Sequence, residues 1–148
     1  MSSIGERLLT EAAKHIGEEY VYGADVDFKA SNYSGPWDCA EFVSYVVYKV
    51  TGKVLGCLDN DVDLADVEPF TGGWRRDIRN EHGVKRIDVD QAIHTPGAIL
   101  LRYPKLKHVV FSDGEGGTIE AKSTRAGVCR SGAWGRGWNY ACVIEFGD

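Results

Sequence analysis

Cys39 is the residue whose position most strongly indicates chemistry, because it directly follows Asp38 at the start of a segment with helical character. Asp38 is a good N-cap, and Glu41 at the third helical position predicts an acidic capping box. A cysteine here meets the positive end of the helix dipole and unpaired backbone N–H groups. Both features favour the nucleophilic thiolate, and the same N–H groups can hold an oxyanion.

Cysteine is also a small residue that proteins often bury, and Cys57, Cys129 and Cys142 fit that description. Judged from its local sequence alone, Cys39 is as consistent with a core residue as with a nucleophile. None of the four cysteines forms a CxxC pair. The pattern therefore predicts reduced thiols and no structural zinc site.

A cysteine nucleophile needs a neighbouring base, and His108 is the best placed of the four histidines. His108 opens the predicted strand HVVFS, which holds a side chain more rigidly than a loop. The others have simpler interpretations: His15 lies in a helix, His82 suits a helix C-terminus, and His94 precedes a turn.

A third group commonly orients the base, and Glu120 is the candidate. A Gly-rich turn separates the strand of His108 from a second strand, TIEA. A hairpin centred near Gly114 would place Val110 opposite Thr118 and His108 opposite Glu120, with Cβ atoms about 5 Å apart. Because a slip of one residue would put the two side chains on opposite faces, spacing alone favours a solvated carboxylate at this position.

The segments that would position these residues change in character along the chain. An apolar helical stripe runs from Ile4 to about Gly17, a polar, Gly-rich loop follows over 20–36, and a second helix is expected from Asp38 to Val50. Later segments are short, β-branched and bounded by Gly or Pro, which predicts the strands TPGAILLRY, KHVVFSD, GTIEAKS and YACVIEF. Helices followed by strands predict an α+β domain with an antiparallel sheet.

Two further segments are ambiguous. The stretch 53–94 is the least regular part of the chain, with short helices expected at 72–83 and 88–93. Its basic segment WRRDIR is typical of a solvated helix face rather than of a substrate site. Trp134, Trp138 and Tyr140 form an aromatic cluster among glycines. Such residues more often cover the edge of a core than line a cleft that stacks on sugar or peptide.

Composition limits the classes of function. A length of 148 residues predicts a single domain over 1–148, and a formal net charge of −5 argues against nucleic acid as a partner. No apolar run approaches the roughly 18 to 20 residues needed to span a membrane. The N-terminus lacks the apolar region of a signal peptide, which predicts synthesis in the cytoplasm and delivery to any outside target by another system.

Taken together, the segments YVYGA, PWDCAEFVSYV, TPGAILL and HVVFSDGEGGTIEAKS resemble the ordered motifs of the NlpC family, papain-like cysteine peptidases of bacterial cell walls. The resemblance covers most of the chain from Tyr20 onward, and only 53–94 has no counterpart. It implies a papain-like α+β fold, with N-terminal helices, the nucleophile at a helix N-terminus and an antiparallel sheet of about four to six strands.

The resemblance also implies roles for individual residues. Cys39 matches the nucleophile, His108 the general base and Glu120 the third residue of the site. Asp38 and Tyr22 fall at positions that contact substrate or the oxyanion. The family usually has His, Asn or Gln where this chain has Glu120, but a carboxylate can also orient an imidazole.

The implied substrate is the stem peptide of peptidoglycan, cut most often at the amide between the γ-carboxyl of D-glutamate and a diamino acid. No metal or organic cofactor is implied. Ala40 replaces the frequent Ser, so the need for a free stem-peptide amine stays open. A domain of this kind suits a phage lytic or tail-associated enzyme or an injected effector. The candidate partners are then a phage particle, secretion machinery or an immunity protein.

Three alternatives remain open at this point. A CHAP-type amidase of the same clan commonly uses Cys, His and Glu and would cut the N-acetylmuramoyl-L-alanine bond. A catalytically silent wall-binding module would keep the fold without the reaction. Acyl transfer shares its first half-reaction with hydrolysis.

Overall fold

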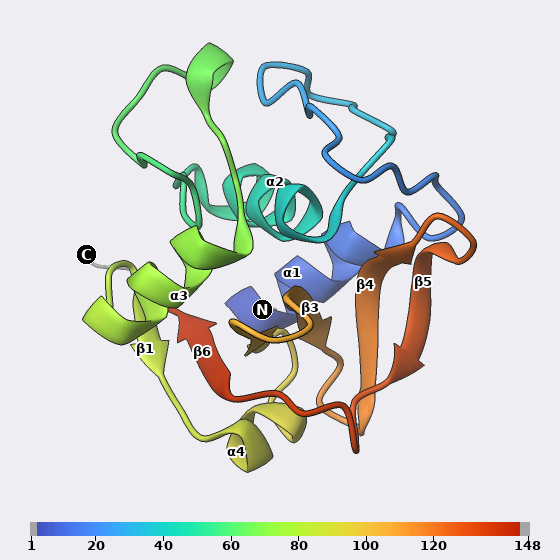
Figure 1. Ribbon diagram of the computed structural model, residues 1–148, viewed down its shortest axis with the longest axis vertical. Helices are drawn as coiled ribbons and strands as arrows, with labels where there is room; N and C mark the ends of the chain where they lie inside the picture. Colours follow the sequence, from blue (N-terminus) through green and yellow to red (C-terminus); the bar gives the residue numbers. More distant parts are fainter. Residues whose placement is uncertain (1–2, 146–148) are drawn as a thin grey trace.

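The computed structural model describes residues 3–145, which form an α+β fold with a six-stranded antiparallel sheet (Figure 1). The helices are α1 (Ile4–Ala13), α2 (Cys39–Thr51), α3 (Thr71–Asn80) and α4 (Val89–Ile93), with a 3₁₀ turn at Leu64–Asp66. The strands are β1 (Val84–Arg86), β2 (Ile99–Arg102), β3 (His108–Ser112), β4 (Gly117–Ser123), β5 (Gly127–Gly132) and β6 (Tyr140–Ile144). The predicted fold class and strand number are confirmed.

The strand order in the sheet is β1-β6-β2-β3-β4-β5. Four of these strands, β2, β3, β4 and β6, correspond to the β-branched segments of the sequence. The predicted last strand extended to Phe146, which lies outside the described residues. β1 and β5 were not predicted: β1 has only three residues, and β5 has glycine at both ends, which weakens the strand signal.

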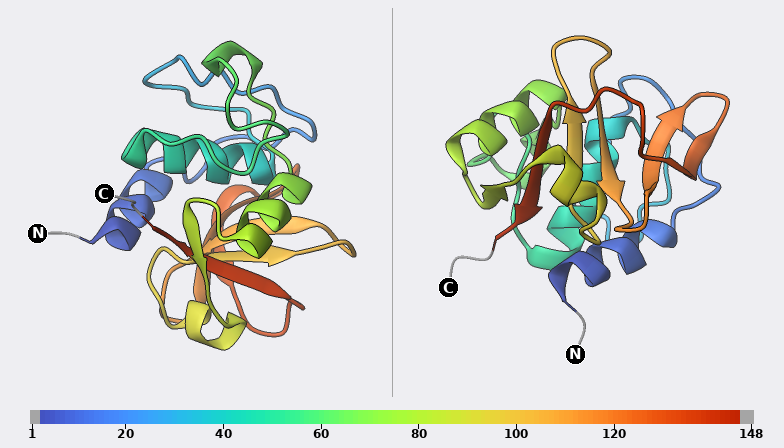
Figure 2. Two further views of the ribbon diagram at one scale, coloured as in Figure 1. Left: turned by 90° about the vertical axis from the view of Figure 1, so that its left-hand side faces the viewer. Right: turned by 90° about the horizontal axis from the view of Figure 1, so that it is seen from below.

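Helices cover both faces of the sheet (Figure 2). Alternation along β2 points Ile99 and Leu101 toward the core formed with α1 and α2, and Leu100 toward the opposite face, where it packs with Ile93 of α4 and Trp138. None of the helices within 3–145 combines the length and apolar character needed to cross a bilayer.

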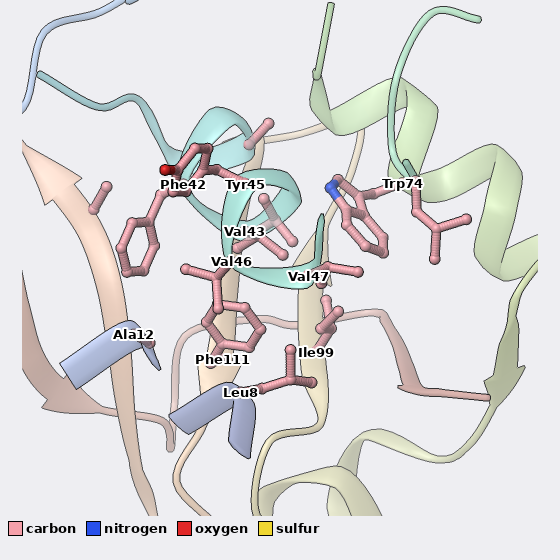
Figure 3. Close-up of a cluster of buried hydrophobic side chains, with 14 of the residues drawn as sticks. Leu8, Ala12, Phe42, Val43, Tyr45, Val46, Val47, Trp74, Ile99 and Phe111 are labelled. Carbon is pink, nitrogen blue, oxygen red and sulfur yellow. The ribbon is translucent and has the colours of Figure 1, made fainter. Parts of the chain in front are cut away.

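The main core lies between α2 and the sheet (Figure 3). Phe42 and Val46 of α2 are fully buried against Leu8 of α1 and Phe111 of β3. Burial of each such side chain contributes about 1.5–3 kcal/mol relative to exposure. This packing fixes the N-terminal end of α2 above the sheet.

Both ends of α2 are determined by the sequence. The Asp38 carboxylate accepts the Glu41 backbone N–H at 2.8 Å, and Gly52 ends the helix in the left-handed conformation with φ 75°. The second half of the predicted capping box is absent, because the Glu41 side chain is buried and its Oε2 has no hydrogen-bond partner in the described part of the chain. Burial, followed by the charges of Asp38 and Asp25, raises the pKa of Glu41 to about 9.

A buried carboxylate connects the two halves of the irregular stretch 53–94. Asp77 of α3 accepts the backbone N–H of Gly56 at 2.7 Å, the side-chain amide of Asn60 at 3.1 Å and the guanidinium of Arg76 at 3.0 Å. Because Asp77 is only 1% exposed, its removal would leave buried donors unpaired.

We therefore expect Asp77→Ala to lower the free energy of unfolding by about 2–4 kcal/mol, measured by urea denaturation. The matched control is Asp66→Ala, which removes an exposed carboxylate of the 3₁₀ turn and should change stability by no more than about 0.5 kcal/mol. Equal stability of Asp77→Ala and wild type would contradict the anchoring role of this carboxylate.

Candidate active site

A pocket of about 610 Å³ lies where the N-terminus of α2 meets the beginning of β3. Cys39 and His108 both line it, together with Tyr20, Tyr22 and Asp38. The helix presents Cys39 at its first position, and the strand presents His108 at its first position. Residues from separate motifs of the sequence therefore share one cavity.

His108 contacts Glu120, although not through the predicted register. Phe111 pairs with Ile119, so the hairpin is centred near position 115, and continuing the ladder puts Glu120 opposite Val110. The predicted register was wrong by two residues, a shift that keeps every side chain on its original face. His108 and Glu120 are consequently diagonal neighbours, and His108 Nε2 lies 2.9 Å from Glu120 Oε1.

Glu120 is fully buried, and several hydrogen-bond donors surround its carboxylate. Arg136 donates to both carboxylate oxygens at 2.7 Å, and the Thr118 hydroxyl donates to Oε2. Burial by itself would raise the pKa of Glu120, but the hydrogen bonds from Arg136, His108 and Thr118 lower it to about 2. An ionised carboxylate only accepts hydrogen bonds, so His108 must donate from Nε2. The neutral ring then has its lone pair on Nδ1.

An arginine and a tryptophan that the sequence analysis did not assign to the site support this pair. The guanidinium of Arg136 lies 4.9 Å from the ring centroid of Trp138, and that ring stacks on His108 at 6.1 Å with an interplanar angle of 23°. Trp138 therefore covers the second core and also supports the imidazole. By contrast, Trp134 is 57% exposed, and its ring contacts His94. The only sequence feature that pointed to Arg136 and Trp138 was the aromatic, Gly-rich segment that contains them.

The environment of Cys39 differs from the predicted one. Burial, followed by the charge of Asp38, raises the pKa of the Cys39 thiol to about 11, against a smaller lowering by backbone N–H groups of Val109, Ala40 and Cys39 itself. The predicted resting thiolate is therefore wrong, because desolvation and a carboxylate one residue away outweigh the end of the helix. The backbone N–H of Val109, at the second position of β3, is among the groups that lower this pKa, so the sulfur lies near the beginning of that strand.

The charge of Asp38 gives a testable contribution to this pKa. We expect Asp38→Asn to lower the Cys39 pKa by about 1 unit, since asparagine keeps the N-cap but removes the negative charge that disfavours a thiolate. The rate of iodoacetamide alkylation as a function of pH, with Cys39 followed by peptide mapping, measures the shift. Asp25→Asn is the control, because Asp25 is not among the groups that shift the Cys39 pKa. An unchanged or higher pKa in Asp38→Asn would contradict this account.

Two tyrosines line the pocket, and they have different environments. Tyr22, the predicted substrate or oxyanion residue, stands at the rim with 89% of its surface exposed. Tyr20 is half-buried, and burial, then the charges of Cys39 and Asp38, raises its pKa to about 12. Tyr20, which pairs with Trp37 in an isolated β-bridge, is thus the tyrosine within electrostatic reach of the sulfur. Tyr20 lies two positions before Tyr22 and was not predicted from the sequence as a site residue.

The stretch without a counterpart in the family motifs contributes to the pocket. Pro69 and Phe70, which precede α3, and Thr71, its first residue, form part of the lining, and Phe70 is 42% exposed. The basic segment of α3 serves structural contacts: Arg75 donates to the Tyr140 hydroxyl at 3.2 Å.

The remaining histidines make contacts away from the pocket. His15 contacts the carboxylates of Glu18 and Glu11 at 2.7 and 3.1 Å. His94 Nδ1 lies 2.9 Å from a backbone oxygen of α4, and His82 is exposed after α3. All four cysteines lie within the described range and are free.

Several solved structures have the same fold, and some of them are NlpC/p60 domains. The NlpC/p60 domain of the peptidoglycan hydrolase SagA matches with a TM-score of 0.63 and 26% sequence identity over 96% of this chain and 98% of that chain. The P60 domain of an antigen from Mycobacterium avium subspecies paratuberculosis gives a TM-score of 0.66 with 20% identity, and the match covers 97% of this chain and 96% of that chain. The peptidoglycan hydrolase RipB from Mycobacterium tuberculosis gives 0.62 with 18% identity, and the match covers 97% of this chain and 66% of RipB.

No protein-family model and no curated protein matches the sequence. The structural matches nevertheless extend over nearly the whole described chain. They confirm the papain-like α+β fold expected from the motifs and support the resemblance to the NlpC family.

Proposed function

We propose that this chain, which has the fold of NlpC/p60 domains, is a cysteine peptidase that hydrolyses an amide bond in the stem peptides of peptidoglycan. The observation that carries the proposal is one pocket containing Cys39 at a helix N-terminus and His108 hydrogen-bonded to an ionised Glu120. The peptidoglycan hydrolases among the structural neighbours support the choice of substrate. The proposed site of action is therefore the cell wall.

In the first half-reaction, His108 removes the thiol proton as the sulfur attacks. The high pKa of Cys39 means that the thiol arrives protonated, so Nδ1 of His108 takes the proton while sulfur bonds to the amide carbon. The carbonyl electrons move to oxygen, where the Cys39 backbone N–H and a tyrosine hydroxyl of the pocket stabilise the charge. Tyr20 is better placed for this role than the exposed Tyr22.

Breakdown of the tetrahedral intermediate completes the first half-reaction, and hydrolysis in the second half-reaction then restores the thiol. Protonated His108 donates its Nδ1 proton to the leaving nitrogen, the C–N bond breaks, and a thioester on Cys39 remains. The neutral ring then takes a proton from water as the water oxygen attacks the thioester carbon. Collapse releases the carboxylic acid and returns the proton to sulfur. Glu120 stays ionised throughout and stabilises the imidazolium that forms twice in this cycle.

The bond that the family resemblance favours is the one between the γ-carboxyl of D-glutamate and the diamino acid. Digestion of defined muropeptides, with products resolved by mass, tests this choice. We expect a fragment that ends in glutamate and a fragment that begins with the diamino acid.

One alternative has a specific observation in its favour. The carboxylate of Glu120 as the partner of His108 fits a CHAP-type amidase, for which intact stem peptides would separate from N-acetylmuramic acid in the same digestion. Intact muropeptides after prolonged incubation with a folded protein would indicate a silent wall-binding module and refute the proposed enzyme.

A further inference from the structure

The wall of the pocket formed by the sheet carries a group of positive side chains. Arg102 ends β2, Lys107 directly precedes β3, and Lys122 lies near the end of β4, and all three line the pocket. Arg102 pairs with His108 across the β2–β3 ladder. Because β3 and β4 are antiparallel, the end of β4 returns to the same edge of the sheet. We call these three residues the cationic wall.

The arginine of this wall is held by backbone carbonyls rather than by an acid. Arg102 donates to the carbonyl of Leu106 at 2.7 Å and to that of Arg136 at 2.8 Å. Its guanidinium lies 5.0 Å from the ring centroid of Trp138. These contacts orient the side chain, and none of the ion pairs formed among residues 3–145 includes it.

The two lysines are held in a similar way. Lys122 donates to the Ser131 hydroxyl at 2.9 Å, and Lys107 lies 5.3 Å from the ring centroid of Tyr103. Lys122 lies two positions beyond Glu120 on β4, at the irregularity between Ala121 and Ser123, and it lines the pocket. No carboxylate within residues 3–145 forms an ion pair with any member of the cationic wall.

The other charges near the pocket do not balance this wall. Arg136 is matched by Glu120, which it binds through both oxygens. The acid that lines the pocket is Asp38, which lies on the opposite side beside Cys39. A chain with a formal net charge of −5 thus has a locally positive wall next to His108. Charges of this sign attract and orient an anionic group of the substrate.

We propose that the cationic wall binds a free carboxylate located within a few bonds of the scissile amide, so that the protein prefers stem peptides in which this carboxylate is not amidated. The inference rests on the proposed function and specifies its substrate. Two groups of a γ-glutamyl-diamino acid peptide have the required chemistry: the α-carboxylate of glutamate on the acyl side, and the carboxylate of the diamino acid on the leaving side. A primary amide has nearly the same shape but no charge, so amidation removes the attraction without adding bulk.

The test uses three synthetic tripeptides, L-alanyl-γ-D-glutamyl-diaminopimelate with free carboxylates, its glutamate α-amide and its diaminopimelate α-amide. We expect kcat/KM for the free peptide to exceed that of one amide by about tenfold, mainly through a lower KM, and the preference to weaken at high salt. The amide that is cut poorly identifies which carboxylate the wall binds. In Lys107→Gln/Lys122→Gln, the preference should fall to about twofold or less, by loss of activity on the free peptide.

Lys105→Gln is the matched control, because Lys105 is an exposed lysine of the same β2–β3 connection that does not line the pocket. It should keep the preference of the wild type. Equal kcat/KM for all three peptides in the wild type, or the same loss of preference in Lys105→Gln, would overturn the inference while leaving the proposed hydrolase intact.

A binding measurement separates failure of the inference from failure of the proposed function. Each peptide is tested for protection of Cys39 from iodoacetamide, which requires occupancy of the pocket but no turnover. If the wild type cleaves none of the peptides, stronger protection by the free peptide, lost in Lys107→Gln/Lys122→Gln, would still support the cationic wall. Equal protection by all three peptides, or none by any, would refute it.

Discussion

Replacing Cys39 by alanine is expected to reduce release of stem-peptide fragments from purified peptidoglycan by about 10⁴-fold or more, because the variant lacks the thiol that lines the pocket and forms the proposed covalent intermediate. Cys39 is half-buried at the first helical position, where alanine is sterically acceptable, so the variant should unfold at the same temperature as the wild type. The rate of appearance of soluble fragments, followed by mass spectrometry, measures the effect.

Cys129→Ala provides the control for the loss of a thiol. Cys129 is half-buried on β5 and does not line the pocket, so its replacement should leave the rate of release within about threefold of the wild type. Undiminished release by Cys39→Ala would refute the nucleophile.

Glu120→Gln is expected to lower kcat by about 10²- to 10⁴-fold with a smaller change in KM. A neutral amide stabilises the imidazolium less than a carboxylate does, and it leaves the half-buried charge of Arg136 without its partner. Glu115→Gln, an exposed change in the turn between β3 and β4, should retain wild-type kinetics. Equal kcat values for Glu120→Gln and wild type would contradict the assigned role.

The same substitution has an effect on acid stability whose sign follows from the pKa of Glu120. Its folded pKa of about 2 lies below the ordinary value of 4.5, so the ionised carboxylate favours the folded state above pH 4.5. This stabilisation is lost as the pH falls from 4.5 toward 2. Urea unfolding between pH 7 and pH 3 should therefore show a weaker loss of stability in Glu120→Gln than in the wild type.

The carboxylate at the third position departs from the family pattern that the motifs resemble, and an arginine binds it. Where that pattern usually has a neutral side chain or histidine, this chain has Glu120 bound through both oxygens by Arg136. The arginine offsets much of the charge that would otherwise act on His108. His108 therefore contacts a Glu–Arg pair, and Trp138 stacks against both His108 and Arg136.

Local patterns predicted most of the elements that position the site. The apolar stripe and caps of α2 and the β-branched segments of β3 and β4 are properties of neighbouring residues, so they can be inferred without knowledge of the fold. The register of the β3–β4 hairpin was more difficult. Asp113 accepts the backbone N–H groups of Glu115 and Gly117, at 2.8 and 2.9 Å, which centres the turn later than the glycines alone indicate.

The electrostatics of the site depended on tertiary burial, which the sequence does not display. The N-terminal position of Cys39 in α2 was predictable, but the extent of its desolvation depends on how β3 and the loop containing Tyr20 pack around it. The contact of Arg136 with Glu120 likewise depends on the return of the chain after β5. The contribution of residues 69–71 to the pocket could not be inferred, because these residues lie in the stretch 53–94, which matches none of the family motifs.

Acid quenching of the protein during turnover of a defined stem peptide, followed by mass spectrometry, tests the central claim most directly. The account predicts a covalent adduct with the mass of the acyl half of the peptide, located on Cys39 by peptide mapping and absent from Cys39→Ala. Cleavage that proceeds without this adduct, and at an unchanged rate after Cys39 has been alkylated, would contradict it.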